Sequence, residues 1–371
     1  MTTGRRLAYL CLETPRPGQA TYTHVHEIIA GLRAIGWEVD LIATGSGGAS
    51  SGSSYLARLR DYIGAQWRLM RRLGAYDGVY MRAHFAAWPA AAFASARSVP
   101  VFQEINGLPA DIFVTYPWLG RLSGLVNWLY RSQMKMAAHV FVVTEGLKRW
   151  AQTEAGHERV SVVSNGANTA LFNPEGPRPA GLGTYVAFVG GLTAWHGIAT
   201  MIAATRQPNW PDHVRLVIIG DGVERHLLTG DSLGSRVHWL GRRPPEEVAA
   251  YLRGALAALS ITEDSADHLA TGVAPLKLFE AMASGAAVIV TDLPFQKELV
   301  GTHETGIVIP MSNPPALAGA VRALADDPDL ARRLGRNGVA YVNAHATWAK
   351  RAGEISDVLT HNLDAEALPS R

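Results

Sequence analysis

Cysteine is almost absent from this sequence: one residue in 371, which excludes an internal disulfide. Cys11 lies in an apolar run, so we expect a reducing compartment. No apolar stretch approaches the length of a membrane-spanning helix. The apolar residues 7–12, which follow two arginines, are too short for a signal peptide and predict a first strand. These scarcities together predict a cytoplasmic protein, either soluble or bound peripherally to a membrane.

Excess charge is also lacking, because the formal net charge is only +2. Nothing in the totals therefore indicates a nucleic-acid partner. Apolar residues make up 48% and charged residues 18% of the chain, which is typical of a globular protein with a large core. A length of 371 residues predicts two or more domains.

Several ligand motifs are missing as well. No G-x-x-x-x-G-K-[ST] loop is present, which argues against ATP hydrolysis, and the turn GDGVE at 220–224 does not complete the dinucleotide pattern G-x-G-x-x-G. There is no H-E-x-x-H motif or Cys/His set for zinc. The nearest approach to a metal site is the cluster Asp264, Asp267 and His268, which would need several waters to complete it. We expect no metal and no cofactor.

Alternating strand and helix patterns fill the chain. Apolar strand patterns at 7–12 and 37–43 flank a helical pattern at 24–32, which is typical of a parallel sheet. This rhythm continues to about residue 163 and restarts at 185. The intervening stretch is rich in proline and glycine and predicts a linker at 174–182. The sequence therefore predicts two doubly wound α/β domains, 1–173 and 183–346, whose facing sheets would form a cleft.

The stretch at 271–292, TGVAPLKLFEAMASGAAVIVTD, combines a helix with a following strand. Proline suits the first helical turn and glycine the end, so we predict a helix from Pro275 to Gly285. Lys277 and Glu280 share one face of it. A cation and an anion near a helix N-terminus suit a ligand with phosphate and hydroxyl groups. An ordinary surface ion pair explains the same residues equally well.

Glycine-rich turns follow two of the predicted strands. In GGLTAWHGI at 190–198, two glycines permit close backbone approach and present N–H groups to an anion. His196 lies at the start of the next helix. The alternative interpretation is an ordinary turn with a surface histidine.

Taken together, these segments resemble a known family. In order, they read TYVAFVGGLTAWHGI, RLVIIGDGVERHLL, VHWLGRRPPEEVAAYL and PLKLFEAMASGAAVIVTD. They are similar to the donor-binding domain of family-4 retaining glycosyltransferases of the GT-B fold. The first half agrees through VYMRAHFAA, VPVFQEINGLP and HVFVVTEGLKRWAQ, so the resemblance covers nearly the whole chain.

The resemblance implies roles for individual residues. Glu280 would hold the ribose hydroxyls of a nucleotide sugar, Lys277 would lie near the diphosphate, and backbone near Arg242 would meet the base. Backbone amides of the Gly-Gly turn and of the loop around Gly18 would cradle the phosphates. The implied donor-binding set is Gly18, Gly190, Gly191, Gly220, Asp221, Gly222, Arg242, Gly272, Val273, Ala274, Leu278 and Glu280. The last helix, 347–371, would cross back to the first domain.

The resemblance also implies a mechanism. The sugar is transferred on one face, and the leaving phosphate takes the acceptor proton, so no protein nucleophile is needed. Catalysis is then positioning and neutralisation of phosphate charge, without a metal.

Three positions depart from the family pattern. Gly272 stands where a first glutamate is often found, so backbone at 272–274 would contact the donor hexose. His196 replaces a lysine and would share phosphate neutralisation with Lys277. Asn106 replaces an active-site histidine and can hydrogen-bond a hydroxyl but cannot act as an acid or base. Glu104, two residues earlier, could contribute.

Two segments of the first half mix arginine with apolar residues and tryptophan, at 55–73 and 118–137. Such basic amphipathic helices suit an anionic membrane surface and a lipid-linked acceptor. The alternative is that Trp and Leu pack in the core while the arginines are solvated.

The sequence thus predicts a retaining hexosyltransferase that uses a UDP- or GDP-sugar and a glycan, lipid-linked or small-molecule acceptor, in polysaccharide biosynthesis. Two alternatives stay open. A nucleotide-sugar epimerase would need acid–base groups that Asn106 and Gly272 do not provide. An inactive homologue could act as a binding or assembly partner.

Overall fold

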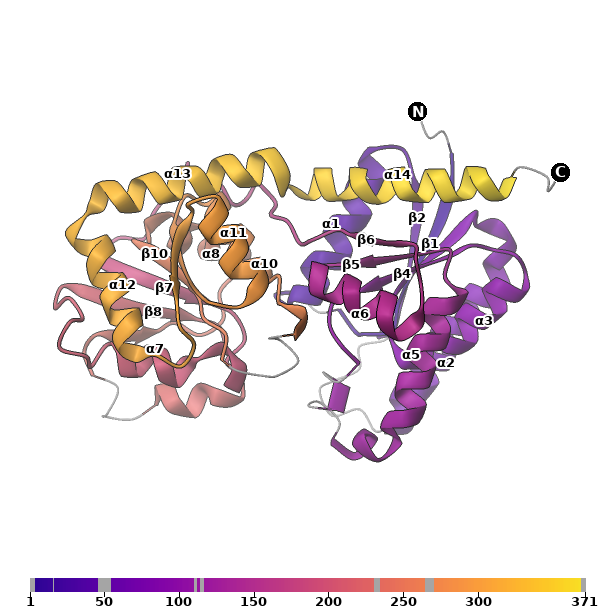
Figure 1. Cartoon of the computed structure of the whole chain (residues 1–371), viewed down its shortest axis with the longest axis horizontal. Helices are drawn as coiled ribbons and strands as arrows, with labels where there is room; N and C mark the ends of the chain where they lie inside the picture. Colours follow the sequence, from indigo (N-terminus) through magenta and orange to yellow (C-terminus); the bar gives the residue numbers. More distant parts are fainter. Residues whose placement is uncertain are drawn as a thin grey trace. The chain divides into compact units, whose positions relative to one another are not determined.

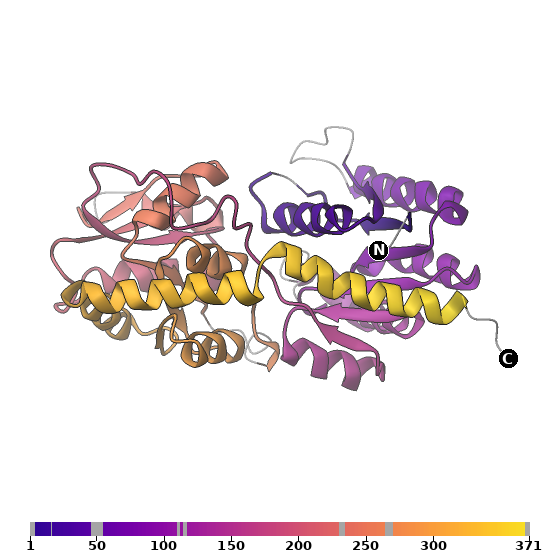
Figure 2. The same ribbon diagram turned by 90° about the horizontal axis from the view of Figure 1, so that it is seen from above.

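The computed structural model describes residues 4–15, 17–45, 55–109, 112–113, 117–229, 234–263 and 270–367. The chain divides into two compact units (Figures 1 and 2). Unit 1 comprises Met1–Ser164 and Trp348–Arg371, and unit 2 comprises Asn165–Thr347. Each unit contains a six-stranded, wholly parallel sheet with helices on its faces. The predicted α/β fold with two doubly wound sheets is confirmed.

In unit 1 the strand order is β2-β1-β3-β4-β5-β6. The strands are β1 Arg6–Cys11, β2 Glu38–Ala43, β3 Gly78–Arg82, β4 Val101–Ile105, β5 His139–Val142 and β6 Val160–Val162. The helices are α1 Ala20–Ala34, α2 Tyr55–Arg72, η1 Leu73–Ala75, η2 Phe85–Ala87, α3 Trp88–Ala96, η3 Pro117–Leu122, α5 Ser123–Met136, α6 Glu145–Ala155 and α14 Trp348–Ala367.

The C-terminal helix α14 packs on α1, beside the first sheet. The indole Nε1 of Trp37 donates to Ser356 Oγ at 2.9 Å, and the ring of Trp348 lies edge-on to His24 with centroids 5.3 Å apart. Both contacts are buried, so the last helix is part of the core of unit 1.

In unit 2 the order is β12-β11-β10-β7-β8-β9. The strands are β7 Thr184–Val189, β8 Val214–Ile219, β9 Val237–Trp239, β10 Ala257–Ser260, β11 Ala287–Thr291 and β12 Gly306–Ile309. The helices are η4 Ala194–His196, α7 Ile198–Ala204, η5 Val223–Leu228, α8 Pro245–Gly254, α10 Leu276–Ala283, α11 Pro294–Thr302, α12 Pro314–Asp326 and α13 Pro328–His345. Strand order reverses between β7 and β10, which is where doubly wound sheets bind ligands.

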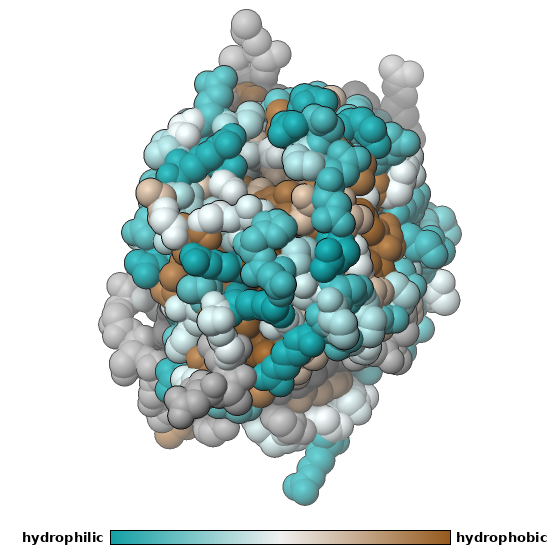
Figure 3. All heavy atoms as spheres, turned by 90° about the vertical axis from the view of Figure 1, so that its left-hand side faces the viewer, coloured by the Kyte–Doolittle hydropathy of each residue, from teal (hydrophilic) through white to brown (hydrophobic). Residues whose placement is uncertain are grey.

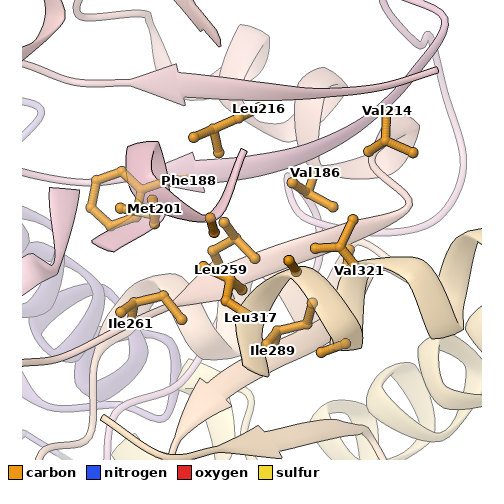
Figure 4. Close-up of a cluster of buried hydrophobic side chains, with 14 of the residues drawn as sticks. Val186, Phe188, Met201, Val214, Leu216, Leu259, Ile261, Ile289, Leu317 and Val321 are labelled. Carbon is orange, nitrogen blue, oxygen red and sulfur yellow. The ribbon is translucent and has the colours of Figure 1, made fainter. Parts of the chain in front are cut away.

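One hydrophobic core of unit 2 lies between this sheet and α7 and α12 (Figure 4). Val186 and Phe188 from β7, Leu216 from β8 and Leu259 from β10 meet Leu317 from α12, and all are at most 2% exposed. Runs of apolar residues are expected in strands buried on both faces. The core fixes the strand ends from which the turns described below emerge.

The predicted linker, 174–182, groups with unit 2, and the division between units falls at Ser164/Asn165. Arg253 of α8 donates to the backbone carbonyl of Pro177 within this segment and to those of Leu171 and Asn173 just before it. Composition signals the proline-rich stretch, but this side chain-to-backbone anchoring has no signal of its own.

Two predicted helices begin differently from expectation. The segment predicted as one helix at 118–137 is the 3₁₀ segment η3 followed by α5, and the helix predicted from His196 begins at Ile198. Gly197, with φ of 63°, separates η4 from α7, so His196 lies in a turn. No helix among the described residues is both long enough and apolar enough to cross a membrane.

Candidate functional site

At the carboxyl edge of the second sheet, backbone hydrogen bonds join the turns after β7, β8 and β9. Gly190 N donates to Ile219 O at 3.0 Å, and Leu192 N donates to Asp221 O at 3.1 Å. Gly220 N donates to Gly241 O at 2.8 Å. These bonds extend the parallel ladder past the strand ends and make the three turns one rigid surface.

Glycine at 220 is required by this packing. A Cβ there would lie 1.8 Å from the carbonyl oxygen of Gly190, with φ of 139°. The GDG turn is therefore explained by turn-to-turn contact. Gly191 differs, because a Cβ there would meet only Thr193 Cγ2 at 4.0 Å and its φ needs no glycine. The backbone of Gly191 is thus bare without an internal packing reason, as expected where a ligand approaches closely.

Lys277 reaches this surface from the first turn of α10. Its ammonium nitrogen is buried without a hydrogen-bond partner among the described residues. The Nζ lies 4.3 Å from the centroid of the Phe188 ring and 3.4 Å from where a Cβ of Gly190 would stand. Burial lowers the pKa of Lys277 to about 7. A buried cation offset only by an aromatic ring is costly, and an anion at the Gly190–Gly191 turn would remove that cost.

His196 also lies beside the Phe188 ring. Its imidazole centroid is 5.8 Å from that of Phe188. The Nδ1 lies 2.5 Å from the carbonyl oxygen of Gly191 and 3.0 Å from Thr193 Oγ1. A carbonyl only accepts, so Nδ1 carries a proton and donates to Gly191 O. This bond holds the imidazole beside the Gly-Gly turn.

Phe188, which sequence reasoning missed, organises these two residues. Figure 4 shows its ring in the hydrophobic core of unit 2, where Phe188 is fully buried. It supports both Lys277 and His196. In the sequence, Phe188 is followed by Val189 and then by the Gly-Gly turn. This position near the end of a strand is the only sequence signal that could have indicated its role.

Glu280 lies on α10 three residues after Lys277 and is partly exposed. Ser284, four residues further on, is buried and donates its hydroxyl to the Glu280 carbonyl at 2.8 Å, so it caps the helix. Leu278, a predicted donor contact, is 0% exposed and packs in the core. Helix α10 itself begins at Leu276, with Pro275 as N-cap.

The backbone before α10 has a defined conformation. Gly272 has φ of 72°, which disfavours a glutamate at this position. The carbonyl of Ala274 accepts from Asn165 Nδ2 at 2.6 Å. Val273, between Gly272 and Ala274 in the sequence, is partly exposed. The remaining backbone groups of 272–274 are the ones that a ligand could engage.

Two further predicted donor contacts are Asp221, within the GDG turn, and Arg242, after β9. Asp221 accepts from Gly222 N at 2.8 Å, so one carboxylate oxygen holds the turn itself. Its other oxygen lies 3.9 Å from Arg242 Nε, and the Arg242 side chain is largely exposed. Contacts thus join Lys277, His196 and Arg242 to the Gly-Gly and GDG turns at one sheet edge, whereas Leu278 packs in the core.

Glu263, which the sequence did not suggest, lies at the end of β10 beside the switch point. Its backbone N donates to Trp195 O at 2.8 Å and so joins β10 to the turn that holds His196. One carboxylate oxygen accepts from Ser312 Oγ, and the other is buried with no hydrogen-bond partner among the described residues.

In unit 1, Glu104 lies at the end of β4 in a buried polar network. Its carboxylate accepts from Tyr9 at 3.2 Å, Tyr80 at 3.0 Å and Arg82 at 2.9 Å, and His24 Nε2 lies at 2.9 Å. Burial alone would raise the pKa of Glu104, but the His24 contact and then Arg82 outweigh it and hold that pKa well below its usual range. Glu104 is 3% exposed. Because its pKa is low, it is an anion inside the fold.

Asn106 follows β4 and also donates its Nδ2 to Glu104, which leaves its Oδ1 as an acceptor with no hydrogen-bond partner among the described residues. Arg82 also binds Glu13 at 3.0 Å, and Thr21 donates to Glu13 at 2.8 Å. Glu104 therefore orients Asn106, His24 and Arg82 and is unsuited to proton transfer.

Gly18, with φ of 80° and open space around it, lies in the turn before α1.

The described residues contain no group of three or more His, Cys, Asp or Glu side chains that could hold a metal. Asp264, Asp267 and His268 lie outside the described residues.

Two units, each with a wholly parallel six-stranded sheet and flanking helices, match the GT-B class of glycosyltransferase structures. Two family models match the chain: "Glycosyltransferase Family 4" over residues 22–171 and "Glycosyl transferases group 1" over residues 177–340. The chain belongs to the group 1 glycosyltransferases. It is 28% identical over 243 residues to the D-inositol 3-phosphate glycosyltransferase of Corynebacterium glutamicum, which covers 57% of this chain and 55% of that protein. The chain spans about half the length of the first curated relatives it matches.

Solved structures agree on the fold. Sucrose-phosphate synthase from Thermosynechococcus elongatus superposes with a TM-score of 0.76 at 18% identity, covering 97% of this chain and 100% of that one. HepE of Anabaena, in complex with UDP-glucose, gives a TM-score of 0.72 at 16% identity, covering 96% and 99%.

Proposed function

We propose that this protein is a retaining glycosyltransferase that moves a sugar from a UDP- or GDP-sugar to an acceptor hydroxyl. The observation that carries the proposal is the buried Lys277 ammonium beside the bare Gly190–Gly191 backbone, with no hydrogen-bond partner among the described residues. A diphosphate matches this arrangement in charge and in its need for N–H donors. The HepE complex with UDP-glucose supports the same ligand class.

In this proposal each residue has a distinct task. Lys277 and protonated His196 neutralise the charge that develops on the leaving diphosphate, while the Gly191 backbone approaches it closely. Glu280 accepts hydrogen bonds from the ribose. The leaving phosphate takes the acceptor proton, so transfer occurs on one face of the sugar without a protein nucleophile or a metal.

The acceptor is proposed as a glycan, lipid-linked or small-molecule hydroxyl. Asn106 Oδ1 can accept a hydrogen bond from a hydroxyl of a bound sugar, since its Nδ2 is committed to Glu104. Glu104 supports this as a positioning residue.

A two-stage experiment tests the proposal. Thermal-shift screening against UDP- and GDP-sugars should give a stabilising donor, because a ligand that binds only the folded state raises the melting temperature. The anomeric configuration of the product, followed by proton NMR with that donor, should match the donor configuration. An inverted product would reject the retaining mechanism. Binding without hydrolysis or transfer would favour the inactive homologue.

A further inference from the structure

Helices α2 and α5 of unit 1, with η3, carry most of the exposed large apolar side chains. They hold eight of the eleven in the described part of the chain, each 46–78% exposed. The eight are Leu56, Leu59, Ile63, Trp67, Trp118, Leu122, Leu125 and Trp128. We call this set the α2–α5 apolar face. The sequence-based alternative, that Trp and Leu of these helices pack in the core, is wrong for these residues.

The spacing of these residues forms a stripe on each helix. On α2, Leu59, Ile63 and Trp67 recur every four residues on one face, while Ala65 and Leu69 on the opposite side are fully buried. Both helices pack against α3, and Trp88 at its start meets Trp128 with ring centroids 5.8 Å apart. Each helix therefore uses one face for the fold and has a second, apolar face that is exposed; Figure 1 shows the course of α2, α3 and α5 in unit 1.

The helices that carry the face are rich in basic residues, although Arg72 pairs with Asp40 and Arg131 pairs with Glu154. Over α2, η3 and α5 the sequence has eight basic residues and one acidic residue, Asp61, although the whole chain carries only +2. Arg71 stacks on the exposed Trp67 ring with 4.4 Å between its guanidinium carbon and the centroid. By contrast, the face of unit 2 drawn in Figure 3 is mostly hydrophilic, with hydrophobic side chains in small areas between polar ones.

We infer that the α2–α5 apolar face docks onto an anionic lipid bilayer. Exposed leucine and tryptophan flanked by arginine suit the headgroup boundary, where the apolar side chains enter the acyl region and the cations meet lipid phosphate. A second copy of this chain is disfavoured as occupant because it would bring two basic surfaces together. Docking favours an acceptor carried by a lipid. The inference does not depend on the proposed sugar transfer.

Cosedimentation of the full chain with vesicles tests the inference at low salt. Phosphatidylcholine vesicles containing phosphatidylglycerol should bind the protein, pure phosphatidylcholine should bind it far less, and added salt should weaken binding. Ile63→Ser with Trp67→Ser, or Leu125→Ser with Trp128→Ser, should each lower the partition coefficient more than about tenfold. Ile35→Ser, an exposed apolar site of unit 1 outside the face, should leave it unchanged.

The electrostatic part has its own variants. Arg60→Gln and Arg71→Gln should each weaken binding by up to about fivefold, and Arg333→Gln on α13 should not. Absence of wild-type binding, or equal binding by the serine variants, would overturn the inference. So would serine variants that change only the oligomeric state in light scattering, or that lose only binding to an acidic protein. Lys277→Met should bind vesicles normally, which separates this test from that of the donor site.

Discussion

The two units place charged residues at equivalent sheet edges but satisfy them differently. In unit 1 the Glu104 anion is surrounded by Tyr9, Tyr80, Arg82, His24 and Asn106, all from the same unit. In unit 2 the ammonium of Lys277 is equally buried, yet it has only an aromatic ring beside it among the described residues. The contrast teaches that a buried charge indicates a ligand only when the fold does not already neutralise it.

The largest expected effect comes from removing the buried charge of unit 1 that the fold already neutralises. Glu104→Gln should lower the free energy of unfolding by about 3–5 kcal/mol, because it removes the buried anion that His24 and Arg82 both contact, and leaves Arg82 with only the more exposed Glu13. Urea unfolding followed by circular dichroism measures the loss. The low pKa of Glu104 means that its contribution is present above the unfolded-state value near 4.3 and is lost as pH falls through the folded value. Glu104→Gln should therefore be less sensitive to acid.

The matched control is Glu154→Gln, which breaks the solvent-exposed pair with Arg131 in the same unit. Its cost should be under about 1 kcal/mol. Equal costs for the two variants would show that Glu104 is not a structural anchor.

Lys277→Met tests the unsatisfied half and has the next largest effect. We expect the transfer rate to fall about 10²–10³-fold, as for loss of one preorganised charge-stabilising group. The ligand-free protein should become more stable, because burial depresses the pKa of Lys277 to about 7. The gain is greatest at and below pH 7 and disappears towards pH 10, where unfolded lysine also loses its proton. Activity assays and thermal melts across pH measure both.

Lys297→Met on α11, an exposed lysine, is the control and should change neither quantity. If Lys277→Met kept full activity, or lowered the stability of the free protein, the diphosphate assignment would fail.

The sequence predicted more of the candidate site in unit 2 than of the Glu104 network in unit 1. The strand–turn–helix rhythm gave both sheets, and the turn at 190–191 and Lys277 were found because they are local patterns. The Glu104 network was not foreseen, because Tyr9, Tyr80 and His24 come from three separated segments that only the strand order brings together.

The same reason explains Phe188 and Glu263. Each looks like an ordinary strand-end residue, and its role depends on which strands are neighbours. Conversely, the glycines of the GDG turn looked like ligand contacts, whereas Gly220 is required by the carbonyl of Gly190 on the next turn. Local pattern thus indicated a candidate site but not which of its residues serve the fold.

A smaller effect should appear in the pH dependence of donor affinity. Free Lys277 has a pKa of about 7, and a bound diphosphate favours the charged form and raises that pKa. Above pH 7, binding therefore requires proton uptake, and the dissociation constant should rise up to about tenfold per pH unit. Isothermal titration calorimetry in buffers of different ionisation enthalpy measures this uptake. His196→Asn should retain the pH dependence of donor affinity, and Lys277→Met should lose it. If Lys277→Met kept this pH dependence, another group would be responsible for it.

The smallest expected effect sharpens the difference between the two kinds of glycine at the unit 2 edge. Gly191→Ala adds a methyl group that meets only Thr193 Cγ2 at 4.0 Å, so the melting temperature should not change. Donor affinity should nevertheless fall by about five- to tenfold, because the methyl group occupies space that the phosphates approach. Gly220→Ala, whose Cβ would lie 1.8 Å from the Gly190 carbonyl oxygen, should instead lower the melting temperature before any effect on binding is seen. If Gly191→Ala bound donor as well as wild type, the bare backbone at 191 would have no role in phosphate recognition, and Lys277 and His196 would have to carry it alone.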